Sequence, residues 1–429
     1  MKKKYRIILY TSIFLLCVVA SIILVVKKSN SVYEEESKPK VVKHKSMLSM
    51  NLEQTAGAGD YKTVTQSSWP TEGYKFNAEL SRCENGSTLS WDDTKKAVIV
   101  SGNLSDKCYV YFDIYQPTLA EYIKSQYTGT QGENNIYYHD SDLANGAGDN
   151  SYRYAGANPN NFVCFGTTES PCPTDNLYRI IGVFGEGYHG VTGKQLVKLI
   201  KYDYMTTDEL GTDGDYSQTY KEWGMDSTYK GTYGDGERIG VYYWNYKATG
   251  SATNTWSTSL LNKTNLNTNF INNIGTTWAN KIATVTWKVG GNTYANISDV
   301  VPATTYQNEI VNPVTTNTTD NATTYSAKIG LMYVSDYGFA ASPDAWTLTM
   351  SSYNNTTATN NNWMYMGLYE WTISRRADSS DYAFRVYFDG YVGSNSVDHR
   401  NGVRASFSLE SSVSYVSGSG SMSDPIVIN

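Results

Sequence analysis

Apolar residues alternate with polar and tyrosine residues near the end of the chain, between residues 381 and 409. Phe384, Val386 and Phe388 are each separated by one such residue, and a second alternating run begins at Val403. A period of two is typical of strands that bury one face and leave the other open. We therefore expect strands here, with an outer face of tyrosine, arginine and small polar side chains.

Two earlier runs, 176–184 and 194–202, are apolar and rich in β-branched residues. The glycine-rich segment between them predicts a hairpin in the core. Between 257 and 283 the apolar positions recur every three or four residues, which predicts helix. Gly275 is expected to divide that region into two short helices.

Further buried strands are predicted at 325–341 and 360–374. The chain would then contain strands, then helices, then strands. This order is typical of α+β proteins, so we expect the α+β class.

Residues 7–26 form an apolar segment without a charged side chain. As a helix it is long enough to cross the ~30 Å hydrocarbon core of a bilayer. Basic residues precede it and the acidic run 34–36 follows two further lysines, so the positive-inside rule places the N-terminus in the cytoplasm. We expect residues 1–28 to be a cytoplasmic basic tip and transmembrane anchor. A cleaved signal peptide is the alternative, although its apolar region is usually shorter.

The rest of the chain, which we expect to be extracellular, divides by composition. Residues 29–73 show no sustained apolar period and predict a flexible stalk. Residues 74–134 predict a small β module followed by a short helix and a linker. Residues 135–429 predict one larger domain.

Cys17 lies in the apolar segment, and the other four of the five cysteines lie in the part expected outside the cell. An even number in an oxidising compartment favours disulfides. We expect Cys83 to pair with Cys108, stapling the small module, and Cys164 to pair with Cys172. Zinc is the alternative, but no histidine lies at ligand spacing from either pair.

The composition argues against a nucleic-acid partner, because the net charge is −6 and only 18% of the residues are charged. Tyrosine is abundant, with 37 of 429 residues. This abundance fits a β-rich extracellular protein, since tyrosine favours strands.

The sequence gives no sign of an enzyme. The four histidines are scattered, and no zinc-protease, phosphate-loop or nucleophile-elbow motif occurs. We expect no catalytic residue, no metal and no cofactor.

The C-terminal third has a recognisable order of spaced residues: a tryptophan in a strand, an arginine-rich segment, a glycine-punctuated hairpin and a final strand near "GVR". These are Trp371, Arg375, Gly390, Gly402, Val403 and Arg404. The pattern, over roughly 175–415, resembles the C-type lectin-like fold, in the branch with the formylglycine-generating enzyme, the variable proteins of diversity-generating retroelements and bacterial surface proteins. The resemblance implies a C-type lectin-like domain over 135–429.

Two departures limit what the resemblance implies. No cysteine follows Cys172, whereas the oxygen-dependent enzyme of this branch needs a pair near the end of its domain. The E-P-N, Q-P-D and W-N-D triplets of calcium-dependent lectins are also absent. We therefore expect neither the oxygen-dependent reaction of that enzyme nor a sugar ligand bound through calcium.

The comparison with the variable proteins remains. From Asp381 to Leu409 there is no Lys, Glu, Gln, Met or Trp, which are residues that adenine mutagenesis of Asn-type codons does not produce. Tyrosine with small polar residues is also the composition of antibody paratopes. We predict a ligand-binding face of Tyr382, Arg385, Tyr387, Tyr391, Ser394, Asn395, His399 and Arg400. The alternative is that these side chains only pack against one another across a hairpin.

The expected function is that of a membrane-anchored bacterial cell-surface protein. It would bind an extracellular protein or glycan through this face. The alternative is a structural envelope protein that packs against cell-wall polymer or against itself, without specific ligand recognition.

Overall fold

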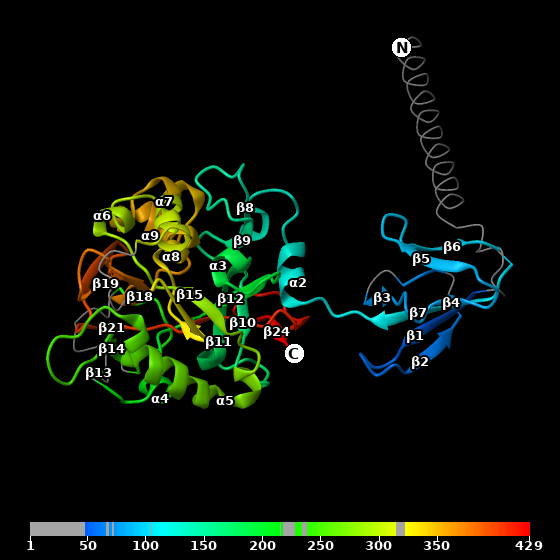
Figure 1. Ribbon diagram of the computed structural model, residues 1–429, viewed down its shortest axis with the longest axis horizontal. Coiled ribbons are helices and arrows are strands. Elements are labelled where there is room, and N and C mark those ends of the chain that lie inside the picture. The colour runs from blue at the N-terminus through cyan, green and yellow to red at the C-terminus, as the bar shows by residue number, and fades with distance from the viewer. Residues whose placement is uncertain are drawn as a thin grey trace, which may run out of the picture. The chain divides into compact units, whose positions relative to one another are not determined.

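The computed structural model describes residues 48–65, 68–70, 73–103, 105–214, 216–217, 228–233, 238–314 and 322–429. The chain divides into two compact units, residues 1–116 and residues 117–429 (Figure 1). Each unit has its own hydrophobic core.

The first unit is a small β structure. Its main sheet has the order β2-β1-β7-β3, with β4 also paired to β7, and β5 and β6 form a separate hairpin. Met50, Leu52, Val110 and Phe112 alternate along β1 and β7 and fill its core. The strands are β1 (Leu48–Glu53), β2 (Tyr61–Val64), β3 (Tyr74–Phe76), β4 (Arg82–Cys83), β5 (Thr88–Asp92), β6 (Ala97–Ser101) and β7 (Cys108–Ile114).

Part of the predicted stalk belongs to this unit. Strand β1 pairs in parallel with β7, and β2 pairs antiparallel with β1. The expectation of a flexible stalk over 29–73 therefore fails for β1 and β2. Leu48, Met50 and Leu52 alternate with polar residues along β1, but this short period-two pattern lies in a region whose overall composition is polar.

Both predicted disulfides are confirmed. Cys83 and Cys108 join β4 to β7, which pair side by side. Cys164 and Cys172 close a loop after β10 in the second unit.

The second unit contains two large sheets. One has the order β17-β22-β12-β11-β9-β8, with β10 also paired to β11, and the other has the order β13-β14-β21-β18-β19-β20. The strands are β8 (Ile136–His139), β9 (Ser151–Tyr154), β10 (Phe162–Cys164), β11 (Leu177–Phe184), β12 (Leu196–Lys201), β13 (Tyr216–Ser217), β14 (Val241–Tyr243), β15 (Val285–Lys288), β16 (Thr324–Ala327), β17 (Ile329–Gly330), β18 (Glu370–Arg375), β19 (Tyr382–Val386), β20 (Val392–Ser396), β21 (Arg400–Gly402), β22 (Ser406–Ser408), β23 (Tyr415–Ser417) and β24 (Val427–Ile428).

The helices of the second unit are short. They are α2 (Leu119–Ser125), η2 (Glu133–Asn135), η3 (Thr174–Asn176), α3 (Glu186–His189), α4 (Thr207–Leu210), η5 (Trp256–Thr258), η6 (Leu261–Phe270), α5 (Ile271–Ala279), α6 (Tyr294–Ile297), α7 (Pro302–Tyr306), η7 (Gln307–Val311), α8 (Val334–Ala340), η8 (Pro343–Thr347), η9 (Met350–Ser352) and α9 (Thr356–Asn360).

The predicted α+β class is wrong. Strands account for 31% of the residues and helices for 22%, so the regular structure is mainly β. Most helices are short, and the abundant asparagine, threonine and serine favour caps and turns over helix interiors. Helix η6, which is rich in asparagine and continues into α5, is an exception.

Several predicted elements are confirmed. Strands β11 and β12 form the expected antiparallel hairpin. Gly275 has φ 76° and ψ 163°, and it interrupts α5 as the sequence suggests. Helix α2 forms where expected, but it belongs to the second unit rather than to the small module, because Leu119 and Ile123 are buried in the core of the larger unit.

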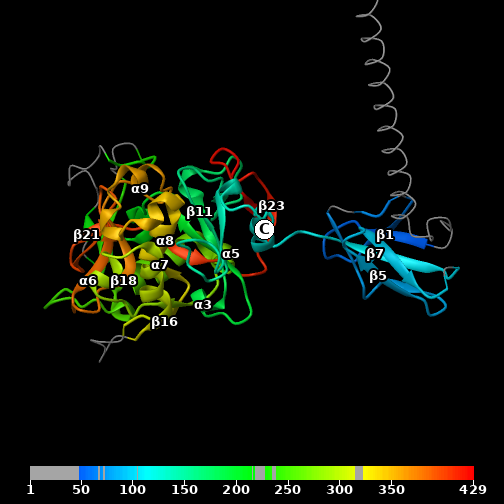
Figure 2. The ribbon, with the colours of Figure 1, turned by 90° about the horizontal axis from the view of Figure 1, so that it is seen from above.

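The predicted strand over 325–341 is only partly correct. Strands β16 and β17 lie in it, but the rest is helix α8, in which every residue is buried. Helix α8 contacts β9 of one large sheet and β18 of the other, and Figure 2 shows it between the strands of the two sheets. A helix buried on all sides has no polar face, so its sequence cannot be told from that of a buried strand.

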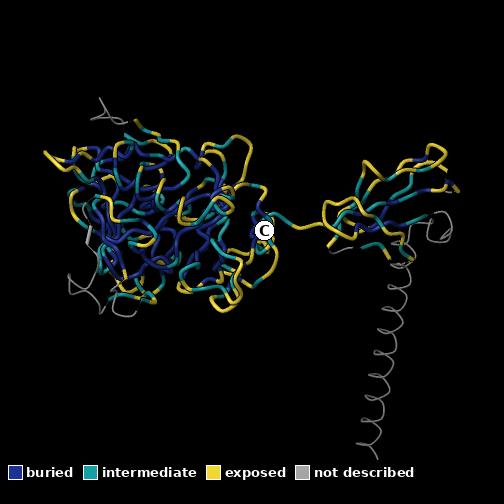
Figure 3. Tube along the Cα trace, turned by 90° about the horizontal axis from the view of Figure 1, so that it is seen from below, coloured by how far each residue is buried: buried dark blue, intermediate teal, exposed yellow. Residues whose placement is uncertain are grey.

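Figure 3 shows the buried interior of the second unit in dark blue. This interior is mainly apolar but contains paired charges. Lys198 on β12 lies 2.7 Å from Asp336 on α8, and Tyr188 donates to the same carboxylate at 2.7 Å. Arg153 on β9 pairs with Asp149 at 2.7 Å. These groups link the helices to the sheet.

The predicted membrane segment, residues 7–26, lies outside the described residues. Within the described ranges, no helix combines the length and the apolar character needed to cross a membrane.

Candidate functional site

The predicted binding residues lie mainly on the hairpin of β19 and β20, at one end of the six-stranded sheet. Arg385 pairs with Gly393 across the hairpin, and the backbone N–H of Tyr387 bonds to the carbonyl of Tyr391. Side chains at alternate positions share a face. Arg385, Tyr387, Tyr391 and Asn395 are therefore on one face of the hairpin.

Tyr382 and Ser394 belong to the opposite face. There the Arg376 guanidinium lies 5.4 Å from the Tyr382 ring centroid and donates to the Ser394 hydroxyl at 3.4 Å. Arg376 also pairs with Asp378 at 3.0 Å. The hairpin residues of the predicted set are thus divided between two faces.

The aromatic and cationic side chains of the first face are packed together. The rings of Tyr387 and Tyr391 are stacked with centroids 4.0 Å apart. The Arg385 guanidinium lies 4.2 Å from the Tyr369 centroid and 4.3 Å from the Tyr387 centroid. Its Nη1 donates to Asn401 Oδ1 at 2.8 Å. We call Tyr369, Arg385, Tyr387, Tyr391 and Asn401 the Tyr–Arg cluster.

Arg385 is only 6% exposed, whereas its tyrosine neighbours are half-buried. Among the described residues, no carboxylate forms an ion pair with Arg385, and its Nε has no hydrogen-bond partner. Buried charges are normally paired, because desolvation without compensation is costly. Arg385 is held by two aromatic faces and one amide oxygen instead.

Gly393 leaves the space that the tyrosine pair occupies. A Cβ at this position would approach the Tyr387 ring to 2.7 Å and the Tyr391 ring to 3.0 Å. The two rings therefore lie directly over the backbone of β20. Burial and a hydrogen bond with Tyr387 raise the pKa of Tyr391, which keeps the hydroxyl neutral.

Two of the predicted residues also protect the edge of the sheet. The Tyr387 hydroxyl donates to the carbonyl of Ser394 at 3.4 Å, and Asn395 Oδ1 accepts from the backbone N–H of Ser396 at 2.8 Å. Exposed edge strands invite pairing with other chains, and covering them is a common protection. Asn395 and Tyr387 therefore have structural contacts of their own.

His399 and Arg400 lie apart from the hairpin, at β21, with β18 between them and β19. His399 is exposed. The Arg400 guanidinium lies 5.7 Å from the ring of Tyr243 on β14.

Sequence analysis missed Tyr369 and Asn401. Asn401 directly follows the predicted Arg400 on β21, and this position in a predicted strand is only a weak signal of a site residue. Tyr369 precedes β18 and lies outside the stretch 381–409, and only the sheet pairing of β18 with β19 brings it to Arg385.

In the described part of the chain, no three His, Cys, Asp or Glu side chains are grouped so that they could hold a metal ion. Comparisons with family models, curated proteins and solved structures gave no significant match. The resemblance to the lectin-like branch thus stays a prediction.

Proposed function

We propose that this protein is a membrane-anchored cell-surface protein that binds an extracellular ligand through the Tyr–Arg cluster. The proposal depends on one observation: the Arg385 guanidinium is buried and has no carboxylate partner among the described residues. It lies beside two stacked, half-buried tyrosine rings. A ligand carboxylate or carbonyl over the cluster would supply the missing acceptor.

The packing of the cluster suits recognition rather than catalysis. Tyrosine offers a large contact area with few rotatable bonds, and the stacking already fixes both rings. The loss of conformational entropy on binding is therefore small. A few such anchors commonly supply most of the affinity of an interface.

The test compares two arginine variants of the full-length protein. Arrays of extracellular proteins and acidic glycans identify a bound probe, and its dissociation constant is then measured for Arg385→Met and Arg376→Met. Methionine keeps the apolar stem and removes the charge. We expect Arg385→Met to weaken binding by about tenfold or more, the effect of a lost charge-assisted hydrogen bond. Arg376→Met, on the opposite face, should bind normally.

Equal affinity of the two variants would refute a role for the cluster. Gly393→Ala adds an independent check, because the new methyl group displaces the tyrosine stack without removing a polar group. It should weaken binding while the melting temperature changes little.

The second candidate is a structural envelope protein. The edge protection by Tyr387 and Asn395 favours it, since these side chains stabilise β20 in the absence of any ligand. In that case Tyr387→Ala would lower the melting temperature, and the arrays would show no probe that depends on Arg385.

A further inference from the structure

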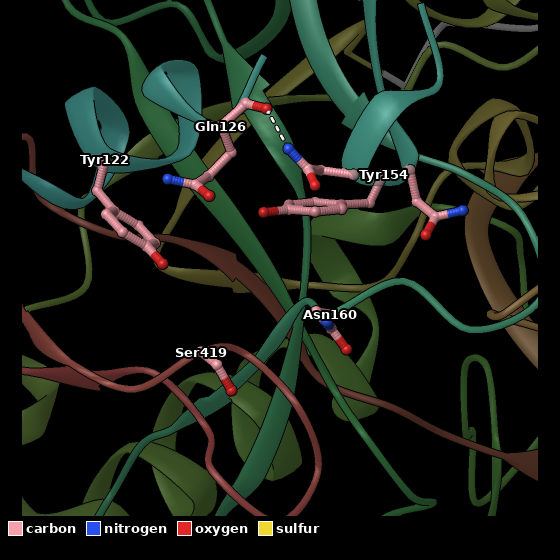
Figure 4. A pocket seen from close by; sticks show the side chains of 7 residues that line it. Tyr122, Gln126, Tyr154, Asn160 and Ser419 are labelled. Atoms are coloured by element: carbon pink, nitrogen blue, oxygen red, sulfur yellow. Dashed lines mark hydrogen bonds between the residues drawn. The ribbon is translucent and has the colours of Figure 1, made fainter. Parts of the chain in front are cut away.

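A second polar site lies in the same unit, away from the Tyr–Arg cluster. It is a pocket of about 200 Å³ between helix α2, the turn before β8, the end of β9 and the loop before β24 (Figure 4). Its lining residues are Tyr122, Gln126, Asn134, Asn135, Tyr154, Asn160 and Ser419.

Tyr154 forms the buried side of this pocket. Only 3% of the residue is exposed. Figure 4 shows its hydroxyl pointing toward the side chain of Gln126. Within the described ranges, this hydroxyl has no hydrogen-bond partner. The hydroxyl faces the open pocket, where it can donate a hydrogen bond to a ligand or accept one from it.

The amide groups are held in place by the backbone around them. Asn134 and Asn135 have φ values of 57° and 59°, in the left-handed region that asparagine tolerates better than most residues. Asn134 Nδ2 donates to the carbonyl of Gln126 at 2.9 Å, and the Asn135 carbonyl accepts from Ala155. Non-glycine residues in this region often cluster at ligand sites.

Packing also holds the lining residues Tyr122, Asn160 and Ser419 in place. Tyr415 stacks on the Tyr122 ring with centroids 3.7 Å apart. The backbone of Gly420 approaches Asn160 so closely that a Cβ there would lie 2.4 Å from the Asn160 carbonyl oxygen. This approach brings Ser419 beside Asn160. The side chain of Asn160 is exposed at the rim and makes no hydrogen bond to another described residue.

The lining has no acidic or basic side chain. Its amides and hydroxyls can each donate and accept, which matches the hydroxyl groups of a sugar. A charged ligand would be desolvated without a counter-charge. The volume holds roughly seven waters and lies below the ~300–1,000 Å³ of pockets for drug-sized ligands, so it suits a single ring. We propose that this pocket binds one neutral saccharide unit.

The test uses the full-length protein with methyl glycosides of glucose, galactose, mannose and N-acetylglucosamine, and with glucuronic acid and glucosamine as charged probes. Saturation-transfer NMR detects binding, and titration gives the dissociation constant. We expect at least one neutral glycoside to bind, and neither charged sugar to bind more tightly than it does. Tyr154→Phe and Asn160→Ala should each weaken binding about fivefold, as expected for one lost hydrogen bond.

Neither substitution breaks a side-chain hydrogen bond to a described residue, so both variants should fold. Tyr325→Phe, the same change at β16 outside the pocket, is the matched control and should bind normally. Arg385→Met should also bind normally, which separates this proposal from the proposed function. The proposal is overturned if no neutral glycoside binds, if a charged sugar is preferred, or if Tyr154→Phe binds as tightly as the wild type.

Discussion

The buried carboxylate of Asp336 accepts from several groups in the second unit. It receives the Lys198 ammonium at 2.7 Å and the Tyr188 hydroxyl at 2.7 Å, and Arg153 lies 3.9 Å away. Lys198, Arg153 and Asp336 are each at most 1% exposed. At this depth, the loss of one partner leaves the others as uncompensated charges.

We predict that Asp336→Ala lowers the free energy of unfolding by about 3–5 kcal/mol. Urea denaturation followed by circular dichroism measures the change. Arg238→Ala is the control, because it breaks an ion pair whose side chains are 50% and 46% exposed. Such surface pairs contribute about 1 kcal/mol or less. Similar losses of unfolding free energy in the two variants would show that the ion pairs of Asp336 contribute no more than a surface pair.

We expect the free energy of unfolding to depend on pH through the buried side chain of His139. Its ring is fully buried, and Nδ1 accepts from the backbone N–H of Ala147 at 3.0 Å. Burial first, and then the charge of Arg153, hold the pKa of His139 well below its usual value of 6.5, while Asp149 opposes them. The folded-state pKa is lowered, so the contribution of His139 is complete above pH 6.5 and decreases as the pH falls.

We expect stability to decrease as the pH falls below 6.5, by up to about 1.4 kcal/mol per pH unit while the folded ring stays neutral. His139→Asn keeps an acceptor for Ala147 but cannot titrate. Urea unfolding at pH 7.5 and pH 5 should therefore show a smaller loss in the variant than in the wild type. Other titrating groups are common to both proteins and cancel. Equal losses would mean that His139 is protonated in the folded state.

For single residues, the sequence predicted the kinds of side chain on the binding face better than it predicted which of them lie together. Alternation along 381–409 identified Tyr387, Tyr391 and Arg385, which do lie together. The same alternation places Tyr382 on the opposite face from Arg385. It does not fix the face of Ser394, because the register of β20 is set by the turn between Tyr387 and Tyr391. The burial of Arg385 also depends on Tyr369, which directly precedes β18 and lies outside the stretch 381–409.

Among the elements, helix α2 is the one that joins the core to the polar pocket. Thr118 Oγ1 accepts from the backbone N–H of Glu121 at 3.2 Å, and the Glu121 carboxylate accepts from the backbone N–H of Thr118 at 2.9 Å. This reciprocal capping box satisfies N–H groups that the first helical turn leaves free.

We predict that Thr118→Ala lowers the stability of α2 by about 1 kcal/mol. Hydrogen exchange measures the change, with faster exchange expected at the amides of Ile123 and Lys124. Thr357→Ala makes the same chemical change at an exposed position of α9, where Asn355 supplies the cap. It should leave exchange in α9 unchanged. Unchanged exchange in α2 would show that packing of Leu119 and Ile123 alone fixes the helix.

The elements that the sequence predicted well have a clear local signal. The hairpin of β11 and β12 has two β-branched runs around glycines, and α2 has a cap and one apolar face. Helix α8 lacks such a signal because contacts with both large sheets bury all its sides. Strand β1 has only three alternating apolar residues, and its partner β7 lies far along the chain.

For the whole molecule, the sequence anticipated a small disulfide-stapled module and a larger domain. The boundary was displaced because α2 looks like an appendage of the module until its apolar face is seen in the core of the second unit. Each unit has its own core, so each is expected to unfold as a separate cooperative transition.

The disulfides provide a test of this independence. Cys83 and Cys108 are separated by 25 residues, and closing a loop of that length stabilises a fold by about 3.5 kcal/mol in the chain-entropy estimate. Cys164 and Cys172 are separated by 8 residues, which corresponds to about 2.5 kcal/mol. We predict that Cys83→Ala with Cys108→Ala lowers only the calorimetric transition of the first unit. Cys164→Ala with Cys172→Ala should lower only that of the second. A shift of both transitions in either double variant would show that the units unfold together, because a crosslink in one independent unit has no effect on the unfolded ensemble of the other.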